Sequence, residues 1–423
     1  MHITPTDQAQ TPREHAGSAR GALVPRFATP SWRPARVAVI HDWLSLAYGR
    51  ERVVEHILRC FPEADLYTLF DFLPDNQRGF LAERKIYTSF LQRLPFVRRR
   101  YQLYLPLMPL ALEQFDLSRY QLIISSHHSF AKGVLSGPNQ LHVTYVHAPA
   151  PYAWDGQHAY LRLKGYDRGL SGLLTRYVLH HFRMWDMRTS HPVDLYLTNS
   201  HFSARRVAKL YGRDARVVHP GVPLERMPLT PEKNGAYLAV SRFAPHKRTE
   251  LLLEAFAHMP ERKLVLISDG GVPKRLRHKV PANVEVIGYQ EDDAFIALLA
   301  GAKALISAAE EDFGTILIEA QACGTPVIAF GSGGALETVR PLEQDDPTGV
   351  FFDEQSGEAI VDAVIRFERF HDRIDPQSCR RNAERFTPER FQQEFLSTVH
   401  QAWERHRQTI SGDVGRDQTL ATA

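Results

Sequence analysis

Short apolar runs bounded by polar turns recur along this chain and are typical of buried parallel strands. Many are followed by apolar residues that return every three or four positions, the spacing of a half-buried helix. Strands that alternate with helices predict an α/β protein built on doubly wound, parallel sheets. A long helix is expected over residues 169–190. The expected strands are residues 37–40, 66–70, 122–124, 143–146, 195–198, 217–222, 237–240, 264–267, 284–287, 304–306 and 327–330.

Residues 304–330 form the clearest unit. The strands at its two ends enclose a helix at 315–323, which Gly324 and Pro326 end. A strand, a helix and a second strand at this spacing form a βαβ unit, so the two strands are expected to be parallel.

Two glutamates, Glu311 and Glu319, lie eight positions apart around the start of this helix. Between them, Phe313, Gly314 and Thr315 place unpaired backbone N–H groups at a helix N-terminus, which favours a phosphate. A carboxylate beside a phosphate needs another role, such as accepting hydrogen bonds from ribose or sugar hydroxyls. The arrangement predicts a nucleotide-sugar pocket, and the alternative is two solvated acids.

Two cations, Arg242 and Lys247, follow the strand at 237–240 and precede a helix. They are placed to converge on one diphosphate, whose charge grows when it departs as a leaving group. Fixed positive charge at that point stabilises the transition state more than the ground state. The alternative is again two solvated side chains.

Composition and charge exclude several classes of protein. A chain of 423 residues exceeds what one hydrophobic core usually serves, so two domains are expected. A net charge of +3 does not indicate a nucleic-acid partner. The three cysteines are far apart and form no Cys-x-x-Cys pair, which indicates a reducing compartment. No apolar run reaches the length of about 18 residues that a membrane-spanning helix needs.

The stretch from Arg84 to Leu112 has no acidic residue, and its cations interleave with aromatic residues and leucines. This combination predicts contact with an anionic membrane surface. Alternatively, the apolar side chains pack into the first domain while the cations are solvated. The cations are Arg84, Lys85, Arg93, Arg98, Arg99 and Arg100.

Two segments of the first half follow expected strands and are therefore candidates for ligand contact. Gly49 precedes a helix that begins near Arg50, and His147 opens the segment that ends at Asp155. The neighbouring pair of His127 and His128 is expected to be structural, because no metal-ligand partner accompanies it.

Several motifs together resemble one family, the retaining glycosyltransferases of family 4, which have the two-domain GT-B fold. The segment from Glu311 to Glu319 is similar to that family's Glu-x7-Glu motif, and Arg242 with Lys247 is similar to its Arg-x4-Lys step. The segment after His147 resembles its His-x-Pro-x-Arg-Tyr-x-Trp-Asp sequence. Three positions depart from the family pattern, Tyr48, Arg50 and Pro151.

This resemblance implies a role for each matched residue. Glu319 would hold the ribose, Glu311 the donor sugar, and His147 would lie near the transferred sugar. Arg242 and Lys247 would bind the diphosphate. Backbone contacts to the donor would come from Gly49, Gly270, Ile287, Phe313, Gly314 and Thr315.

The resemblance also implies the domain organisation. Two Rossmann-like domains, residues 35–219 and 220–392, would face each other across a cleft, and a helix at 393–408 would return to the first domain. Residues 1–34 are expected to be a disordered leader and residues 409–423 a disordered tail.

The implied activity is transfer of a hexose, with GDP-mannose as the favoured donor and a lipid-linked oligosaccharide as acceptor, in exopolysaccharide, capsule or O-antigen assembly. No cofactor is expected. The sequence contains no Asp-x-Asp, so a metal that bridges the diphosphate is not indicated. The enzyme would work at the cytoplasmic face of the cell membrane. The alternatives are a UDP-sugar-dependent transferase, a nucleotide-sugar-binding protein without turnover, and an epimerase or phosphorylase on the same fold.

Overall fold

The computed structural model describes residues 32–420, except 46–49, 82–83, 242, 244 and 269. Most of the expected leader therefore lies outside the described residues. Within the described ranges, no helix combines the length and apolar character needed to cross a bilayer.

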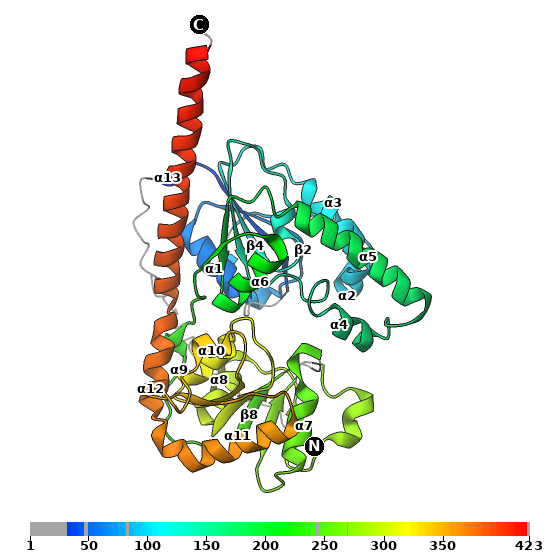
Figure 1. The fold of residues 1–423 in the computed structure, drawn as a ribbon, viewed down its shortest axis with the longest axis vertical. Helices are drawn as coiled ribbons and strands as arrows, with labels where there is room; N and C mark the ends of the chain where they lie inside the picture. The colour runs from blue at the N-terminus through cyan, green and yellow to red at the C-terminus, as the bar shows by residue number, and fades with distance from the viewer. Residues whose placement is uncertain are drawn as a thin grey trace, which may run out of the picture. The chain divides into compact units, whose positions relative to one another are not determined.

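The first domain is a seven-stranded sheet in the order β3-β2-β1-β4-β5-β6-β7, and all of its strand pairs are parallel (Figure 1). Its strands are β1 (Val37–Leu44), β2 (Asp65–Asp71), β3 (Ile86–Thr88), β4 (Leu122–His127), β5 (Leu141–Val146), β6 (Leu195–Thr198) and β7 (Ala215–Val217). Its helices are α1 (Arg50–Cys60), α2 (Val97–Arg100), α3 (Met108–Glu113), α4 (Gln157–Lys164), α5 (Gly169–Arg188) and α6 (His201–Tyr211). A 3-10 helix, η4 (Tyr101–Leu107), links α2 to α3.

The second domain is a six-stranded sheet in the order β10-β9-β8-β11-β12-β13, again with parallel pairs throughout. Its strands are β8 (Tyr237–Val240), β9 (Leu264–Ile267), β10 (Val284–Ile287), β11 (Ala304–Ser307), β12 (Val327–Phe330) and β13 (Gly349–Phe352). Its helices are α7 (Thr249–Ala257), α8 (Asp292–Gly301), α9 (Thr315–Ala322), α10 (Ala335–Thr338), α11 (Gly357–Phe370) and α12 (Pro376–Ala383).

These two sheets confirm the predicted α/β class with doubly wound, parallel sheets. Every residue of β4 and β5 is buried, including the polar side chains of Ser125, His142 and Thr144, as expected for strands that helices cover on both faces. In each sheet the strand order reverses beside the first strand, β1 or β8. Ligands of open α/β sheets gather at the carboxyl ends of the strands beside such a reversal.

The expected strand at 217–222 is wrong. The strand β7 ends at Val217, and Val222 N donates a hydrogen bond to Phe386 O rather than to a neighbouring strand. Pro220 has no N–H to donate, and β7 is an edge strand with only one partner, so little holds the chain in the sheet beyond Val217.

The last helix, α13 (Pro388–Leu420), packs against the first domain. Phe391 contacts the rings of His56 on α1 and Tyr145 on β5, and Figure 1 shows α13 running beside α1. The helix continues to Leu420, through most of the segment expected to be a tail from residue 409. No proline follows Pro388 in the sequence, so nothing in the chain forces the helix to end earlier.

A buried ion pair joins the loop after β4 to α5. Lys132 Nζ lies 2.5 Å from Asp186 Oδ1, and both side chains are fully buried. Trp154 Nε1 and Tyr211 Oη donate hydrogen bonds of 2.8 and 3.0 Å to the other carboxylate oxygen. Burial lowers the pKa of Lys132, and the neighbouring Asp186 carboxylate opposes that shift.

Removing one member of this pair is expected to destabilise the protein strongly. Lys132→Met would leave the Asp186 carboxylate buried without its cation, at a cost of about 3–5 kcal/mol in the free energy of unfolding. The exposed pair of Arg59 and Glu55 is a matched control, and Arg59→Ala should cost less than about 1 kcal/mol. Urea unfolding followed by circular dichroism measures both changes, and equal costs would contradict the assignment.

Candidate active site

A glycine fixes the turn between β11 and α9. Gly314 has a φ of 85°, and a Cβ atom there would lie 2.8 Å from Leu317 Cδ1. Only glycine adopts this left-handed conformation without strain, so the backbone N–H groups at the start of α9 stay uncovered by a side chain. Thr315 is the first residue of the helix.

The glycines after β12 hold the loop that carries Glu311. Gly334 N donates a hydrogen bond of 2.7 Å to Glu311 O, and Glu311 forms an isolated parallel bridge with Gly333. A Cβ atom on Gly333 would lie 2.4 Å from Glu311 O. This close approach explains why glycines are needed here, although they do not form a dinucleotide-binding fingerprint.

The structure brings Lys247 and Glu311 together. Lys247 Nζ lies 2.8 and 3.0 Å from the two carboxylate oxygens of Glu311, and both side chains are partly buried. The sequence assigned these residues to two different parts of a ligand, and their direct pairing was not predicted. Any diphosphate that binds Lys247 must therefore compete with Glu311 for the same ammonium group.

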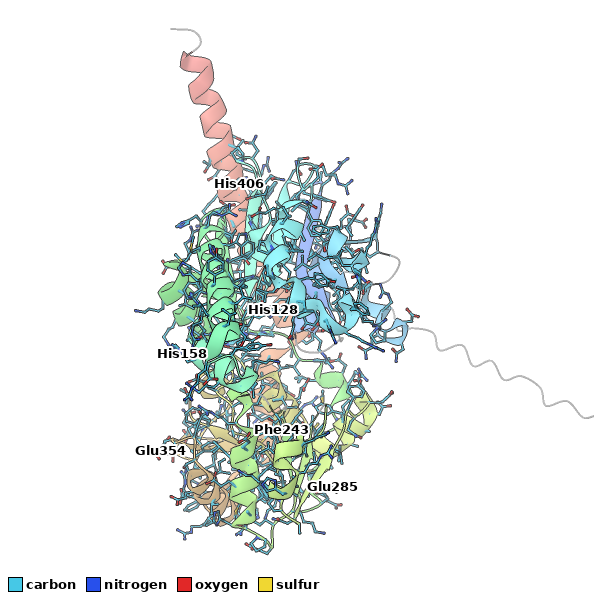
Figure 2. All side chains as sticks on the ribbon, turned by 90° about the vertical axis from the view of Figure 1, so that its right-hand side faces the viewer. His128, His158, Phe243, Glu285, Glu354 and His406 are labelled. Carbon is cyan, nitrogen blue, oxygen red and sulfur yellow. The ribbon has the colours of Figure 1, made fainter. Side chains whose placement is uncertain are left out.

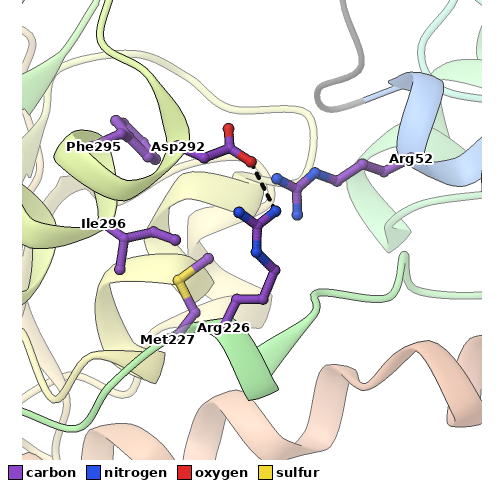
Figure 3. Close-up of a pocket in the computed structure, with 6 residues that line it drawn as sticks. All are labelled: Arg52, Arg226, Met227, Asp292, Phe295 and Ile296. Atoms are coloured by element: carbon purple, nitrogen blue, oxygen red, sulfur yellow. Dashed lines mark hydrogen bonds and ion pairs between the residues drawn. The ribbon is translucent and has the colours of Figure 1, made fainter. Parts of the chain in front are cut away.

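Glu319 lies on α9 and is almost completely buried. Burial raises the pKa of its carboxyl group, the cation of Arg52 opposes that shift, and Asp292 adds to it. Arg52 and Asp292 also line a small pocket with Met227, Phe295 and Ile296, shown in Figure 3.

A salt bridge closes one side of this pocket. Arg226 Nη1 lies 2.7 Å from Asp292 Oδ2, and Arg52 points toward the same carboxylate in Figure 3. Glu319 and this pocket share two charged neighbours, so they belong to one electrostatic environment.

His147 lies directly after β5, and its buried ring is held by a chain of hydrogen bonds. Its Nε2 atom is 2.8 Å from Ser126 Oγ, which is 3.1 Å from His41 Nδ1. The three residues come from the carboxyl ends of β5, β4 and β1. Asn199 Nδ2, just after β6, donates a hydrogen bond of 2.8 Å to His147 O and so fixes the backbone of His147.

Sequence reasoning missed the role of Asp42. Its fully buried carboxylate accepts hydrogen bonds of 2.6 to 3.0 Å from the backbone N–H groups of residues 128–131. It also pairs at 2.6 Å with Nδ1 of His128, which directly follows β4 and is labelled in Figure 2. Burial would raise the pKa of Asp42, but the neighbouring histidines hold it well below its usual value. The signal was a single acid two residues after the expected strand 37–40, within the observed β1.

Asp312, beside Glu311, connects the two domains. Arg206 Nη1 of α6 lies 2.8 Å from Asp312 Oδ1, and Arg206 also binds Asp155 at 2.8 Å. Burial raises the pKa of Asp312 to about 6, although Arg206 opposes the shift. The loop that carries Glu311 is thus tied to the segment that begins at His147, a contact that the sequence did not predict.

The other predicted positions divide into three groups. Gly270 and Ile287 lie at or just after the carboxyl ends of β9 and β10, the two strands beyond β8 in the second sheet. Phe313 is buried against His219 and Phe386, so only its backbone is available to a ligand. Gly49 and Arg242 lie outside the described residues, and their assignments stay predictions.

Among the described residues, no group of three or more His, Cys, Asp or Glu side chains is arranged to hold a metal ion. The three cysteines are buried and unpaired as disulfides.

The two sheets, with charged side chains gathered at their carboxyl ends, define a protein of the GT-B class. Residues 225–386 match the family model described as Glycosyl transferases group 1, and residues 47–226 match the model described as Glycosyltransferase Family 4. The chain therefore belongs to glycosyltransferase family 4.

Curated relatives share part of the chain. It is 32% identical over 180 residues to the GDP-mannose-dependent monoacylated alpha-(1-6)-phosphatidylinositol monomannoside mannosyltransferase of Corynebacterium glutamicum, covering 35% of this chain and 47% of that protein. The chain is 30% identical over 239 residues to the D-inositol 3-phosphate glycosyltransferase of Geodermatophilus obscurus, covering 47% of this chain and 50% of that protein. The chain thus spans about half the length of these relatives.

Solved structures show the same fold at low sequence identity. HepE from Anabaena, crystallised with UDP, superposes with a TM-score of 0.61 at 17% identity, covering 86% of this chain and 99% of that one. Sucrose-phosphate synthase from Thermosynechococcus elongatus superposes with a TM-score of 0.61 at 18% sequence identity, covering 92% of this chain and 100% of that one.

Proposed function

We propose that this protein is a retaining glycosyltransferase that moves a hexose from a nucleotide sugar to an acceptor hydroxyl. The observation that carries the proposal is the pairing of Lys247 with Glu311 beside the open N-terminus of α9, with Glu319 buried further along the same helix. A cation, a helix N-terminus and two carboxylates suit a diphosphate flanked by two sets of hydroxyls.

The proposed donor is GDP-mannose, and the proposed acceptor is a lipid-linked oligosaccharide of exopolysaccharide, capsule or O-antigen assembly. The first relative described above is named for GDP-mannose and a mannosylated lipid, which supports both choices. A UDP sugar is the alternative donor on the same fold.

In the proposed reaction, the bond between the sugar C1 and the diphosphate oxygen breaks while the acceptor oxygen bonds to C1 on the same face. The acceptor proton passes to the departing diphosphate. Lys247 and Arg242 stabilise the charge that grows on this leaving group, and Glu311 orients the sugar hydroxyls. His147, fixed by Ser126, positions the sugar from the first domain.

A panel of nucleotide sugars with the purified protein tests this function. Thermal shift reports binding, and slow donor hydrolysis reports activation of the sugar. A shift with GDP-mannose and release of mannose support the proposal. A shift without hydrolysis or transfer indicates a binding protein, a new nucleotide sugar indicates an epimerase, and dependence on inorganic phosphate indicates a phosphorylase.

Metal independence forms part of the proposal, because the sequence has no Asp-x-Asp and cations are available to replace a metal. Transfer by dialysed enzyme is expected to continue in EDTA at a rate within about twofold of the untreated rate. An activity that EDTA removes, and that magnesium or manganese alone restores, would contradict this prediction.

Attachment to the cytoplasmic face of the membrane is also proposed. Within residues 84–112, Phe96 is 77% exposed and Leu103 is 69% exposed, next to the exposed arginines 98–100. Other apolar side chains of the stretch, including Leu91 and Leu112, are buried in the first domain. The stretch therefore combines packing into the core with an apolar, basic outer surface that suits anionic lipid.

A further inference from the structure

The helix α5 has an unusual distribution of apolar side chains. Its inward face is formed by Gly172, Leu179, Phe182 and Asp186, all buried. A helix on the surface of a soluble domain normally turns polar residues to water on its opposite side. The outward side of α5 does not follow this rule.

Leucines and a tyrosine occupy the outward side of the first turns of α5. Leu170 is 81% exposed, Leu173 64%, Leu174 63% and Tyr177 61%. They recur at the spacing i, i+3, i+4 and i+7, so they form one continuous stripe along the helix. Met184, 54% exposed, continues the stripe two turns later.

The chain before α5 extends this surface. Leu163 is 41% exposed and Tyr166 is 39% exposed, where α4 ends and the turn to α5 begins. Exposed apolar side chains grouped in this way mark an interaction surface rather than ordinary scatter.

Positive charge adjoins the start of the stripe. Arg162, Lys164 and Arg168 are exposed between α4 and the start of α5. The acids of residues 157–188 are Asp167, which lies 3.7 Å from Arg168, and Asp186, which is buried with Lys132. An exposed apolar stripe beside cations that few acids neutralise complements an anionic bilayer, whose headgroups attract the cations while its interior accepts the leucines.

The C-terminal end of α5 contacts the residue that directly follows the stretch already proposed to contact lipid. Glu113 of α3 accepts hydrogen bonds from Trp185 Nε1 and Arg188 Nη2 of α5, at 3.0 and 2.6 Å. Figure 1 shows α2, α3, α4 and α5 grouped on the same side of the first domain.

We propose that the outward stripe of α5, residues Leu170, Leu173, Leu174 and Tyr177, inserts into the headgroup region of an anionic bilayer. It supplies apolar attachment, whereas arginines 98–100 supply electrostatic attachment. The proposal rests on the proposed function in one respect, since a lipid-linked acceptor brings the enzyme to a bilayer. It assigns a membrane-inserting element that the sequence described only as a long helix.

Cosedimentation of the full chain with vesicles tests the proposal. Vesicles of phosphatidylcholine with phosphatidylglycerol are compared with phosphatidylcholine alone, at low and high salt. Leu173→Ser with Leu174→Ser is expected to lower the partition coefficient on anionic vesicles by about tenfold or more, because two inserted leucines are lost. The binding that remains should be more sensitive to salt than that of the wild type, because the cations then contribute a larger share of it.

The matched control replaces two exposed apolar residues of the second domain, Ile365→Ser with Phe370→Ser. Ile365 is 43% exposed and Phe370 is 37% exposed, and both lie on α11. This variant is expected to bind vesicles like the wild type. Equal vesicle binding by the α5 variant and the wild type would overturn the proposal.

Two further measurements separate the possible failures. Light scattering after gel filtration reports whether a second copy covers α5. A wild-type dimer that the α5 variant converts to a monomer, with no vesicle binding by either, would overturn the proposal. The thermal shift with GDP should be the same in all three proteins, so failure of the donor assignment is read separately from failure of membrane insertion.

Discussion

Replacing Arg242 and Lys247 together by alanine is expected to lower the rate of sugar transfer by about a thousandfold or more. Each cation is expected to make a charge-assisted contact to the leaving diphosphate worth roughly 2–4 kcal/mol in the transition state. Two such contacts sum to about 4–8 kcal/mol, and each 1.4 kcal/mol corresponds to about a tenfold change in rate. The effect should fall mainly on kcat, because the charge on the diphosphate grows as the bond breaks.

The structure adds a second expected effect to the replacement of Lys247. Lys247 Nζ contacts both carboxylate oxygens of Glu311, so Lys247→Ala removes a cation and also leaves the Glu311 carboxylate without a cation beside the proposed diphosphate site. Repulsion between Glu311 and the diphosphate should then weaken donor binding as well as transfer. Lys247→Ala combined with Glu311→Gln should recover part of the nucleotide affinity, because that repulsion is gone.

Arg248→Ala is the matched control for the clamp. Arg248 is exposed, adjoins Lys247 in sequence and hydrogen-bonds Gln355 rather than Glu311. Its variant should transfer sugar at a rate close to that of the wild type. Wild-type turnover in the Arg242→Ala, Lys247→Ala double variant would contradict the assignment of the clamp.

Local sequence signals predicted most of the strands but not the contacts between distant segments. The apolar run 304–306 marks β11, because burial on both faces gives a local signal that does not depend on which strands lie beside it. The pairing of Lys247 with Glu311 depends on β8 and β11 lying side by side, and no local pattern records that adjacency. The contact between Arg206 and Asp312 joins residues 106 positions apart for the same reason.

Two other differences between the predicted and the observed structure have local causes, which a pattern of apolar residues does not show. The segment 217–222 has strand-like composition, but an edge strand with Pro220 after it lacks the partners to continue. The stripe on α5 has the periodicity of a core-facing helix, and periodicity alone cannot say which side faces the core. Only the burial of Leu179 and Phe182 shows that the leucines near its start face outward.

The two glutamates of α9 and its preceding loop are expected to differ in what they bind. Glu319→Ala should weaken the binding of GDP by about 10- to 100-fold, which corresponds to the roughly 1.5–3 kcal/mol of a hydrogen bond to a charged group. Glu311→Ala should leave GDP affinity unchanged or raise it, because Lys247 loses its competing partner and becomes available to the diphosphate. The same variant should lose at least about a hundredfold in transfer, since nothing then orients the sugar.

Calorimetry with GDP, followed by transfer assays with GDP-mannose, distinguishes these outcomes. Glu310→Ala is the control, because Glu310 adjoins Glu311 but is exposed and hydrogen-bonds Ser332. Glu319→Gln separates loss of charge from loss of packing, because it keeps the size of this buried side chain. If Glu311→Ala and Glu319→Ala weaken GDP binding equally, both carboxylates act on the nucleotide, and the assignment of Glu311 to the sugar is wrong.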